Sequence, residues 1–183
     1  MIGQLGISFA VCSPDVNEAP LSGEAPSDYV ERITGAKMEA ASASRESASG
    51  NYRAILTADT VVVLGETILG KPATDEDSLD MVTSLSGRTH NVITCYCLRD
   101  TSSGESRIRQ VSTDVIFRSL SPEEICAYVA TGEGRDKAGA YAIQGRAAGF
   151  VRRVHGSYSS VVGLPLAELV EDLRDFGILG QES

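Results

Sequence analysis

The sequence lacks any long hydrophobic run. No stretch approaches the roughly 18 consecutive apolar residues that a membrane-spanning helix requires. The opening residues Met1-Ile2-Gly3-Gln4 also lack the basic residues that begin a signal peptide. We therefore expect a cytoplasmic protein with no membrane partner.

Cysteine and histidine are both scarce. The cysteines show neither the C-x-x-C spacing of a zinc site nor the density of a secreted disulfide framework, and we expect reduced, partly buried thiols. His90 and His155 stand apart from any second ligand, so a core or surface position is expected for each. The four cysteines are Cys12, Cys95, Cys97 and Cys126.

Positive charge is in the minority, with 16 Lys and Arg residues against 25 Asp and Glu residues and a net charge of −9. This balance argues against a nucleic-acid groove, because such a surface needs a positive field. If the ligand is an anion, its basic partners must be gathered locally.

The 183 residues predict a single domain, residues 1–183, because no Pro/Ser-rich linker divides the chain. Helices and strands with hairpins predict an α/β fold, in which a mixed twisted sheet is flanked by helices. The expected helices cover residues 27–45, 74–87, 121–132 and 165–176, and the expected strands cover 54–64, 67–69, 90–99, 107–118 and 150–154.

Lys37 lies in the middle of an apolar helical stripe. Ser27 or Asp28 can cap the start of this helix, and Val30 and Ile33 share the face of Lys37. A lysine in such a stripe commonly extends its ammonium group to solvent. Its surroundings alone therefore leave a structural and a functional role open.

Asp59 interrupts an apolar run, Ala54 to Leu64, that is typical of a strand buried on both faces. An unpaired carboxylate inside such a strand would cost several kcal/mol, so Asp59 must be neutralised, hydrogen-bonded or placed at a strand end. It could cap a nearby turn, but we favour a functional role.

Lys71 lies on a loop whose geometry is restricted by Gly70 and Pro72. The spacing from Gly65 to Lys71 is similar to a phosphate-binding P-loop. That motif requires a hydroxyl residue after the lysine and a helix beginning there, whereas this chain has Pro72. We therefore exclude a P-loop enzyme, and Lys71 could also be a solvated turn residue.

The segment Gly132 to Arg146 combines glycines with Arg135, Lys137 and Arg146. Glycine frees backbone N–H groups to turn toward an anion, so the segment is a candidate anion site. The segment could instead be a mobile surface loop that binds no anion. Tyr141 and Ile143 alternate with small residues, which favours an ordered strand edge.

Several short motifs, taken in chain order, are similar to the Maf family of nucleotide pyrophosphatases. The resemblance extends over nearly the whole chain. Its motifs are Asn17-Glu18-Ala19-Pro20, Ala36-Lys37, Ala58-Asp59-Thr60-Val61-Val62, Gly70-Lys71-Pro72, Leu85-Ser86-Gly87-Arg88-Thr89-His90, Gly132-Glu133, Asp136-Lys137-Ala138-Gly139-Ala140-Tyr141, Ile143-Gln144-Gly145 and Val161-Val162-Gly163-Leu164-Pro165-Leu166.

The resemblance implies a two-lobed fold with a central cleft, and hydrolysis of a nucleoside triphosphate to the monophosphate and pyrophosphate. It implies that Asp59 activates water, that Glu18 and Asp59 hold a divalent cation, Mg²⁺ or Mn²⁺, and that Lys37, Lys71 and Lys137 face the phosphates. An aspartate with an ordinary pKa is a weak base at neutral pH, so a metal-bound water is a sensible partner.

The resemblance further ties Thr60 and Gln144 to base choice. The segment around Gln144 resembles the branch acting on dTTP and UTP, and an amide can pair with a pyrimidine imide. A homodimer is also implied.

The chain departs from the family at its beginning. Family members open with a strand and a Ser-x-Ser-Pro-Arg-Arg loop that leads into a helix, whereas residues 2–6 resemble the tail of that helix. Either the start of the chain was assigned too far downstream, or the protein is a shortened homologue with weakened phosphate binding. Loss of those arginines would leave an alternative open, a non-catalytic homologue that binds a nucleotide or a partner.

Overall fold

The computed structural model of the protein describes residues 1–44 and 52–180. The chain forms two compact units. Unit 1 comprises residues 1–59, 94–110 and 163–183, and unit 2 comprises residues 60–93 and 111–162. In chain order the elements are η1 (Ile2–Leu5), α1 (Pro26–Ala43), β1 (Ala54–Leu64), β2 (Thr67–Leu69), α3 (Asp75–Leu85), β3 (Thr89–Asp100), β4 (Ser106–Phe117), α4 (Pro122–Val129), η2 (Ala138–Ala140), η3 (Arg146–Phe150), β5 (Val151–His155), α5 (Tyr158–Val162) and α6 (Leu166–Asp175).

The strands form one sheet in the order β2-β1-β3-β4-β5. The sheet is antiparallel, and β1, β3 and β4 each contribute residues to both units. The predicted α/β fold with flanking helices is confirmed.

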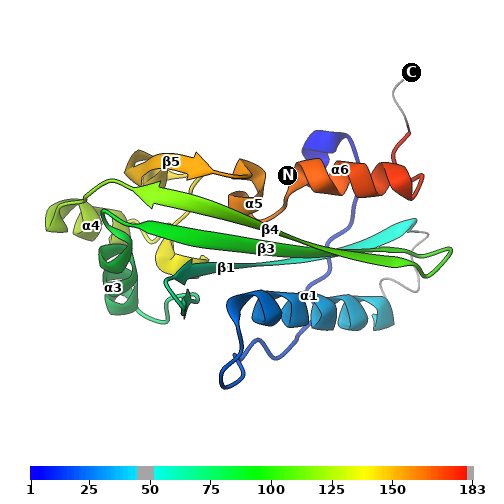
Figure 1. Ribbon diagram of the computed structural model, residues 1–183, viewed down its shortest axis with the longest axis horizontal. Coiled ribbons are helices and arrows are strands. Elements are labelled where there is room, and N and C mark those ends of the chain that lie inside the picture. Colours follow the sequence, from blue (N-terminus) through cyan, green and yellow to red (C-terminus); the bar gives the residue numbers. More distant parts are fainter. Residues whose placement is uncertain (45–51, 181–183) are drawn as a thin grey trace. The chain divides into compact units, whose positions relative to one another are not determined.

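In unit 1, helices α1 and α6 lie on opposite faces of the sheet (Figure 1). Burial of Leu169 and Leu173 on α6 against Tyr96 and Leu98 of β3 forms one core cluster. On α1, the stripe that includes Val30 and Ile33 is fully buried. Each helix therefore covers its face of the sheet with an apolar stripe, as helical periodicity requires.

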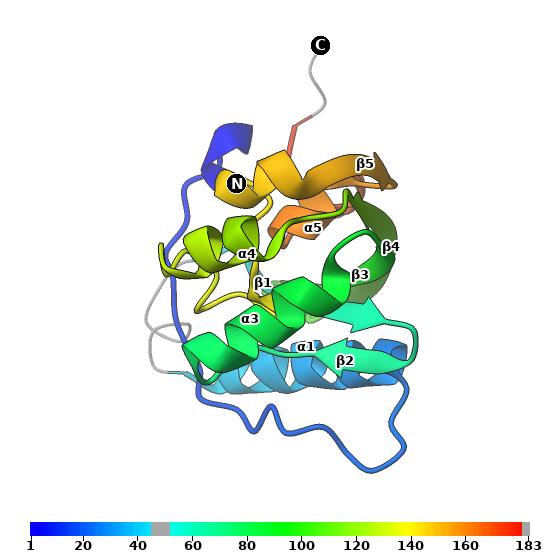
Figure 2. The same ribbon diagram turned by 90° about the vertical axis from the view of Figure 1, so that its left-hand side faces the viewer.

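In unit 2, helices α3 and α4 lie side by side (Figure 2). Both begin with a complete capping box, Thr74 with Asp77 and Ser121 with Glu124. The β1–β2 hairpin pairs Leu64 with Thr67. The predicted helices 74–87 and 121–132 and the predicted strands 54–64 and 67–69 are confirmed, with both helices ending two to three residues earlier.

Three local predictions need correction. Helix α1 is capped by Ala25, with Pro26 in its first turn, and neither Ser27 nor Asp28 is the cap. Its predicted final residue, Arg45, lies outside the described residues. Only residues 61–63 of β1 are fully buried, so most of the strand is partly accessible. Residues 141–145 form no strand, because turns and short 3-10 helices shape this segment.

An apolar groove of about 460 Å³ lies in unit 1. Its lining includes Ile7, Phe9, Leu56 and Ile178, and none of the predicted site residues. Size and apolarity alone would favour this groove as a ligand site. The charged groups required for phosphate chemistry lie elsewhere.

Asp172 is a fully buried carboxylate that joins α6 to the sheet. Arg107 and Arg109 each contact its Oδ1 at 2.6 Å, and the Tyr96 hydroxyl donates to its Oδ2. Asp172→Asn should lower the free energy of unfolding by about 3 kcal/mol, because two cations lose their shared charge partner. The midpoint temperature of thermal unfolding should fall by roughly 6–12 °C.

The matched control is Asp175→Asn. Asp175 contacts Arg107 at 2.7 Å but is 60% exposed, so the unfolding free energy should change by less than about 0.5 kcal/mol. Equal losses in Asp172→Asn and Asp175→Asn would contradict the buried network as the source of stability.

The same network predicts a pH dependence. Burial alone would raise the pKa of Asp172, but hydrogen bonds from Tyr96 and Arg107 and the charge of Arg109 lower it below 3.8. A carboxyl with a lowered pKa stabilises the fold above its unfolded pKa and loses that contribution as pH falls through the folded value. The stability difference between wild type and Asp172→Asn should therefore narrow below about pH 4.

Candidate active site

Asp59, Lys37 and Glu18 converge in unit 1. Lys37 Nζ lies 2.6 Å from Asp59 Oδ1 and 2.7 Å from Glu18 Oε1. The Lys37 and Asp59 side chains are 20% and 17% exposed, and that of Glu18 is 42% exposed. The ammonium group of Lys37 is therefore shared by two carboxylates, and it does not extend to solvent alone.

Hydrogen bonds between α1 and the sheet set the position of Lys37. Thr57 Oγ1 donates to the carbonyl of Thr34 at 3.1 Å, and the Thr34 hydroxyl is within 3.3 Å of the Cys95 carbonyl on β3. Alternate residues of a strand share a face, so Asp59 points to the same side as Thr57, toward α1. Lys37 is three residues after Thr34, on the same side of the helix.

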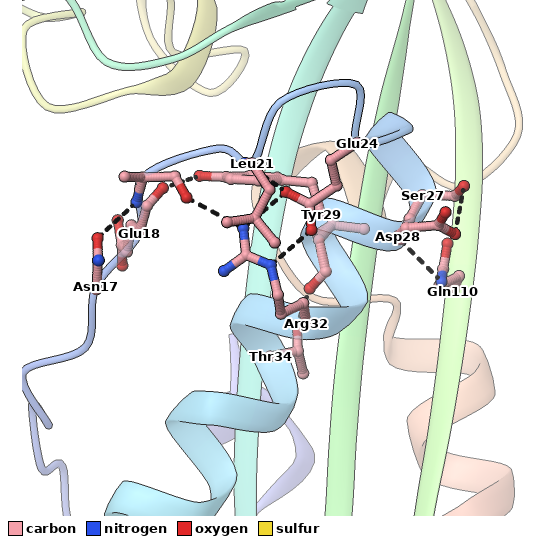
Figure 3. Close-up of polar contacts among 12 residues, drawn as sticks. Asn17, Glu18, Leu21, Glu24, Ser27, Asp28, Tyr29, Arg32, Thr34 and Gln110 are labelled. Carbon is pink, nitrogen blue, oxygen red and sulfur yellow. Dashed lines mark hydrogen bonds and ion pairs between the residues drawn. The ribbon is translucent and has the colours of Figure 1, made fainter.

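The loop that carries Glu18 is held by the first turns of α1 (Figure 3). The Tyr29 hydroxyl donates to the Glu18 carbonyl at 2.9 Å, and Arg32 donates to the Ala19 carbonyl at 3.1 Å. Arg32 also forms a two-pronged ion pair with Glu24, at 2.5 and 2.7 Å. Tyr29 and Arg32 thus fix two consecutive backbone carbonyls, those of Glu18 and Ala19.

The charge state of this group is set by its partners. Burial alone would lower the pKa of Lys37, but hydrogen bonds to Asp59 and Glu18 outweigh it and raise the pKa above the ordinary lysine value. Burial, and then the charges of Asp59 and Glu18, raises the pKa of Tyr29. Lys37 is therefore protonated at neutral pH and cannot act as a base.

In unit 2, the loops that carry Lys71 and Lys137 are joined. The Gly139 N–H donates to the Gly70 carbonyl at 3.0 Å. The Asp136 carboxylate lies 2.7 Å from Lys137 Nζ. That hydrogen bond lowers the pKa of Asp136, and the charge of Lys71 acts in the same direction. The two lysines thus share one neighbourhood.

The remaining predicted residues also belong to unit 2. Thr60 is the residue of β1 that directly follows Asp59, and Gln144 is exposed on the turn after Ile143. With Thr60, Lys71, Lys137 and Gln144, unit 2 holds all the predicted contacts to base and phosphate other than Lys37. The roles of these residues stay predictions.

The glycines of the segment Gly132 to Arg146 mainly allow close packing. A Cβ on Gly134 would lie 2.0 Å from the Ala140 carbonyl oxygen, and one on Gly145 would lie 2.1 Å from a Glu133 carboxylate oxygen. Glu133 itself accepts from the Arg146 N–H at 2.8 Å. A carboxylate of the protein therefore occupies one of the backbone donors that we predicted for an anion.

The described residues contain no group of three or more His, Cys, Asp or Glu side chains placed to hold a metal ion. Glu18 and Asp59 offer two carboxylates that meet at one ammonium group. Mg²⁺ is commonly bound by one or two carboxylates together with substrate phosphates and water. The donors present fit such a partly protein-made site.

Sequence patterns missed Tyr29 and Arg32, because a tyrosine and an arginine near a helix start are ordinary surface residues. A signal was available in their spacing of three, which places both on one helix face. His90 is buried and hydrogen-bonded, so of the two positions expected for it, core or surface, it has the core one. In the described part of the chain, no helix is long and apolar enough to cross a membrane.

The fold and these side chains define an α/β protein in which Glu18, Lys37 and Asp59 meet in unit 1 and the loops of Lys71 and Lys137 are joined in unit 2. Comparison with known proteins gives the family: the pattern described as "Maf-like protein" matches residues 1–176. The chain belongs to the Maf family, which confirms the resemblance found in the sequence.

Three relatives with known names are similar over most of their length. A dTTP/UTP pyrophosphatase from Geobacter sulfurreducens is 46% identical, over 98% of this chain and 91% of the relative. One from Geobacter metallireducens is 47% identical over the same shares. One from Nitrosomonas europaea is 49% identical over 90% of this chain and 78% of the relative.

Proposed function

We propose that this protein hydrolyses dTTP and UTP to the monophosphate and pyrophosphate. The observation that carries the proposal is the ion-paired group of Glu18, Lys37 and Asp59, in a chain that is 46% identical to a dTTP/UTP pyrophosphatase. No observation on the described residues favours the alternative, a non-catalytic homologue.

Asp59 is the proton acceptor in the proposed reaction. Hydrolysis adds one water across the anhydride between the α- and β-phosphates, so its oxygen joins phosphorus and its proton must be removed. Lys37 is protonated and cannot take that proton. The carboxylate of Asp59, whose Oδ1 lies 2.6 Å from Lys37 Nζ, can accept the proton.

Lys37, Lys71 and Lys137 supply positive charge to the phosphates. The protein has three lysines, and all three belong to the proposed site. Pyrophosphate gains negative charge as it leaves, and fixed ammonium groups stabilise that charge more strongly than water does.

A divalent cation, Mg²⁺ or Mn²⁺, completes the proposed site. Glu18 and Asp59 would hold it together with phosphate oxygens, and the ion would supply charge neutralisation and a more acidic water. Thr60 and Gln144 would contact the base, where the Gln144 amide can both donate to and accept from a pyrimidine imide. We also propose that the protein is cytoplasmic and that it forms a homodimer. Gel filtration would test the homodimer.

The proposed function predicts a defined product pair. Purified protein incubated with dTTP or UTP and Mg²⁺ should release monophosphate and pyrophosphate in equal amounts, measured by anion-exchange chromatography. GTP should be a poorer substrate, and EDTA should stop the reaction. Release of orthophosphate and a nucleoside diphosphate would contradict cleavage between the α- and β-phosphates.

A further inference from the structure

His90 and Tyr141 form a buried polar contact in unit 2 that the proposed reaction does not use. His90 Nε2 lies 2.9 Å from the Tyr141 hydroxyl. His90 belongs to β3, and Tyr141 directly follows η2. His90 is 2% exposed and Tyr141 is 5% exposed. Buried polar groups of this kind usually have a partner, because an unmade hydrogen bond is costly there.

The ring of Phe117 completes the pocket around this pair. Its centroid lies 4.9 Å from that of His90 and 5.0 Å from that of Tyr141, both edge to face. Burial lowers the pKa of His90 to about 4, with Asp114 acting in the opposite direction, and burial raises the pKa of Tyr141. Both side chains are therefore neutral near pH 7.

The turn that ends at Tyr141 has an unusual backbone. Gly139 and Ala140 both adopt left-handed geometry, with φ of 68° and 58°. An alanine is strained in that region, where its Cβ approaches the following carbonyl. Surrounding contacts must hold such a turn. The nearest of these in the chain is the contact of the Tyr141 hydroxyl with His90.

This turn is tied to both lysine loops of unit 2. Its Gly139 N–H donates to the Gly70 carbonyl, directly before Lys71, and Lys137 is the residue that precedes η2. On the other side, the Ala142 N–H donates to the Tyr128 hydroxyl at 3.1 Å, two residues before Gln144. A displacement of Tyr141 would therefore move both lysines and Gln144.

We propose that His90 is a positioning residue that acts through the Tyr141 hydroxyl to hold residues 137–144 in the shape that binds the nucleotide. The inference rests on the proposed function, because it assigns Lys71, Lys137 and Gln144 to the substrate. His90 touches none of the reacting atoms. Its effect is on where the binding groups lie before the nucleotide arrives.

The test compares Tyr141→Phe and His90→Leu with wild type in steady-state hydrolysis of dTTP. Each variant removes one side of the hydrogen bond, and Tyr141→Phe retains the packed ring. The KM for dTTP should rise about tenfold, with kcat within about threefold, because a hydrogen bond of ordinary net strength is worth about one decade in binding. A merely structural role would lower the active fraction and leave KM unchanged.

Two further variants sharpen this test. His90→Gln carries its amide as many bonds from Cβ as Nε2 is, so it should restore KM to within about threefold of wild type. The double variant of His90→Leu and Tyr141→Phe should equal either single variant, because the same bond is lost. A double effect equal to the product of the two single effects would overturn the proposal.

The matched control is Tyr96→Phe in unit 1. It also removes a buried tyrosine hydroxyl, here one that donates to Asp172, but it lies outside the turn. It should lower thermal stability without raising the KM for dTTP. An equal rise in KM in this control would assign the effect to general destabilisation and overturn the proposal.

A second measurement is independent of turnover. Amide hydrogen exchange of residues 137–144 should become faster in Tyr141→Phe and His90→Leu, while exchange in β3 stays slow. Unchanged exchange in this segment would overturn the proposal. If wild type hydrolyses no nucleotide, the proposed function fails, whereas faster exchange in both variants would still support the hold of His90 on the turn.

Discussion

Asp59→Asn should lower kcat for dTTP by about 10²- to 10⁴-fold, the usual contribution of a general base. Asparagine has almost the same shape and can still accept a hydrogen bond from Lys37, but it cannot take a proton from water. It is also a weaker cation ligand than a carboxylate. The KM for dTTP should change little, because the lysines proposed to face the phosphates remain.

Single-turnover kinetics with excess enzyme would measure this loss at the chemical step. Asp175→Asn on α6 is the matched control, because it makes the same chemical change on an exposed carboxylate and should retain full activity. Thermal unfolding of Asp59→Asn would show that the fold persists. Turnover of Asp59→Asn within about threefold of wild type would remove Asp59 from the proposed mechanism.

Lys37→Met should lower kcat/KM for dTTP by about 10²- to 10³-fold, comparable to the loss of one preorganised electrostatic donor. The change has two causes. The phosphates lose one ammonium group, and the carboxylates of Asp59 and Glu18 lose the cation that lies within 2.7 Å of both. Lys37→Arg should remain impaired, since a planar guanidinium cannot reproduce both contacts of a compact Nζ.

Adding Glu18→Gln to Lys37→Met tests whether Lys37 acts only by balancing the carboxylates. This second change removes one of the two facing negative charges, so it should recover part of the thermal stability without recovering kcat/KM. Recovery of activity in the double variant would mean that Lys37 serves only to balance the carboxylates, and would exclude its action on the phosphates.

Local signals in the sequence determined most of the elements. The strands 54–64 and 67–69 and the helices 74–87 and 121–132 were predicted from residues within a few positions of one another. The prediction of a strand edge at residues 141–143 was wrong, because contacts with residues distant in the chain outweigh the local pattern there. Tyr141 and Ile143 alternate with small residues like a strand, but burial of Tyr141 against His90 and Phe117 bends the chain into turns.

The site shows the same division. Asp59 was identified from its apolar neighbours, because an isolated carboxylate in a β-rich run is costly whatever lies nearby. Lys37 gave no comparable signal by itself, since a lysine on a helix is ordinary, and only the resemblance assigned it a role. Tyr29 and Arg32 escaped notice because their partner, the loop of Glu18, is not defined by helix periodicity.

By itself, the sequence determined the α/β class, the family, and Asp59 as a carboxylate that needs a polar or charged partner. Each of these depends on local pattern or on motifs in chain order. Only the tertiary structure decided that Lys37 is shared between Asp59 and Glu18, and that His90 meets Tyr141. These partners are 19 to 51 residues apart in the chain. Contacts over such separations depend on how helices and strands pack, and no local pattern encodes that packing.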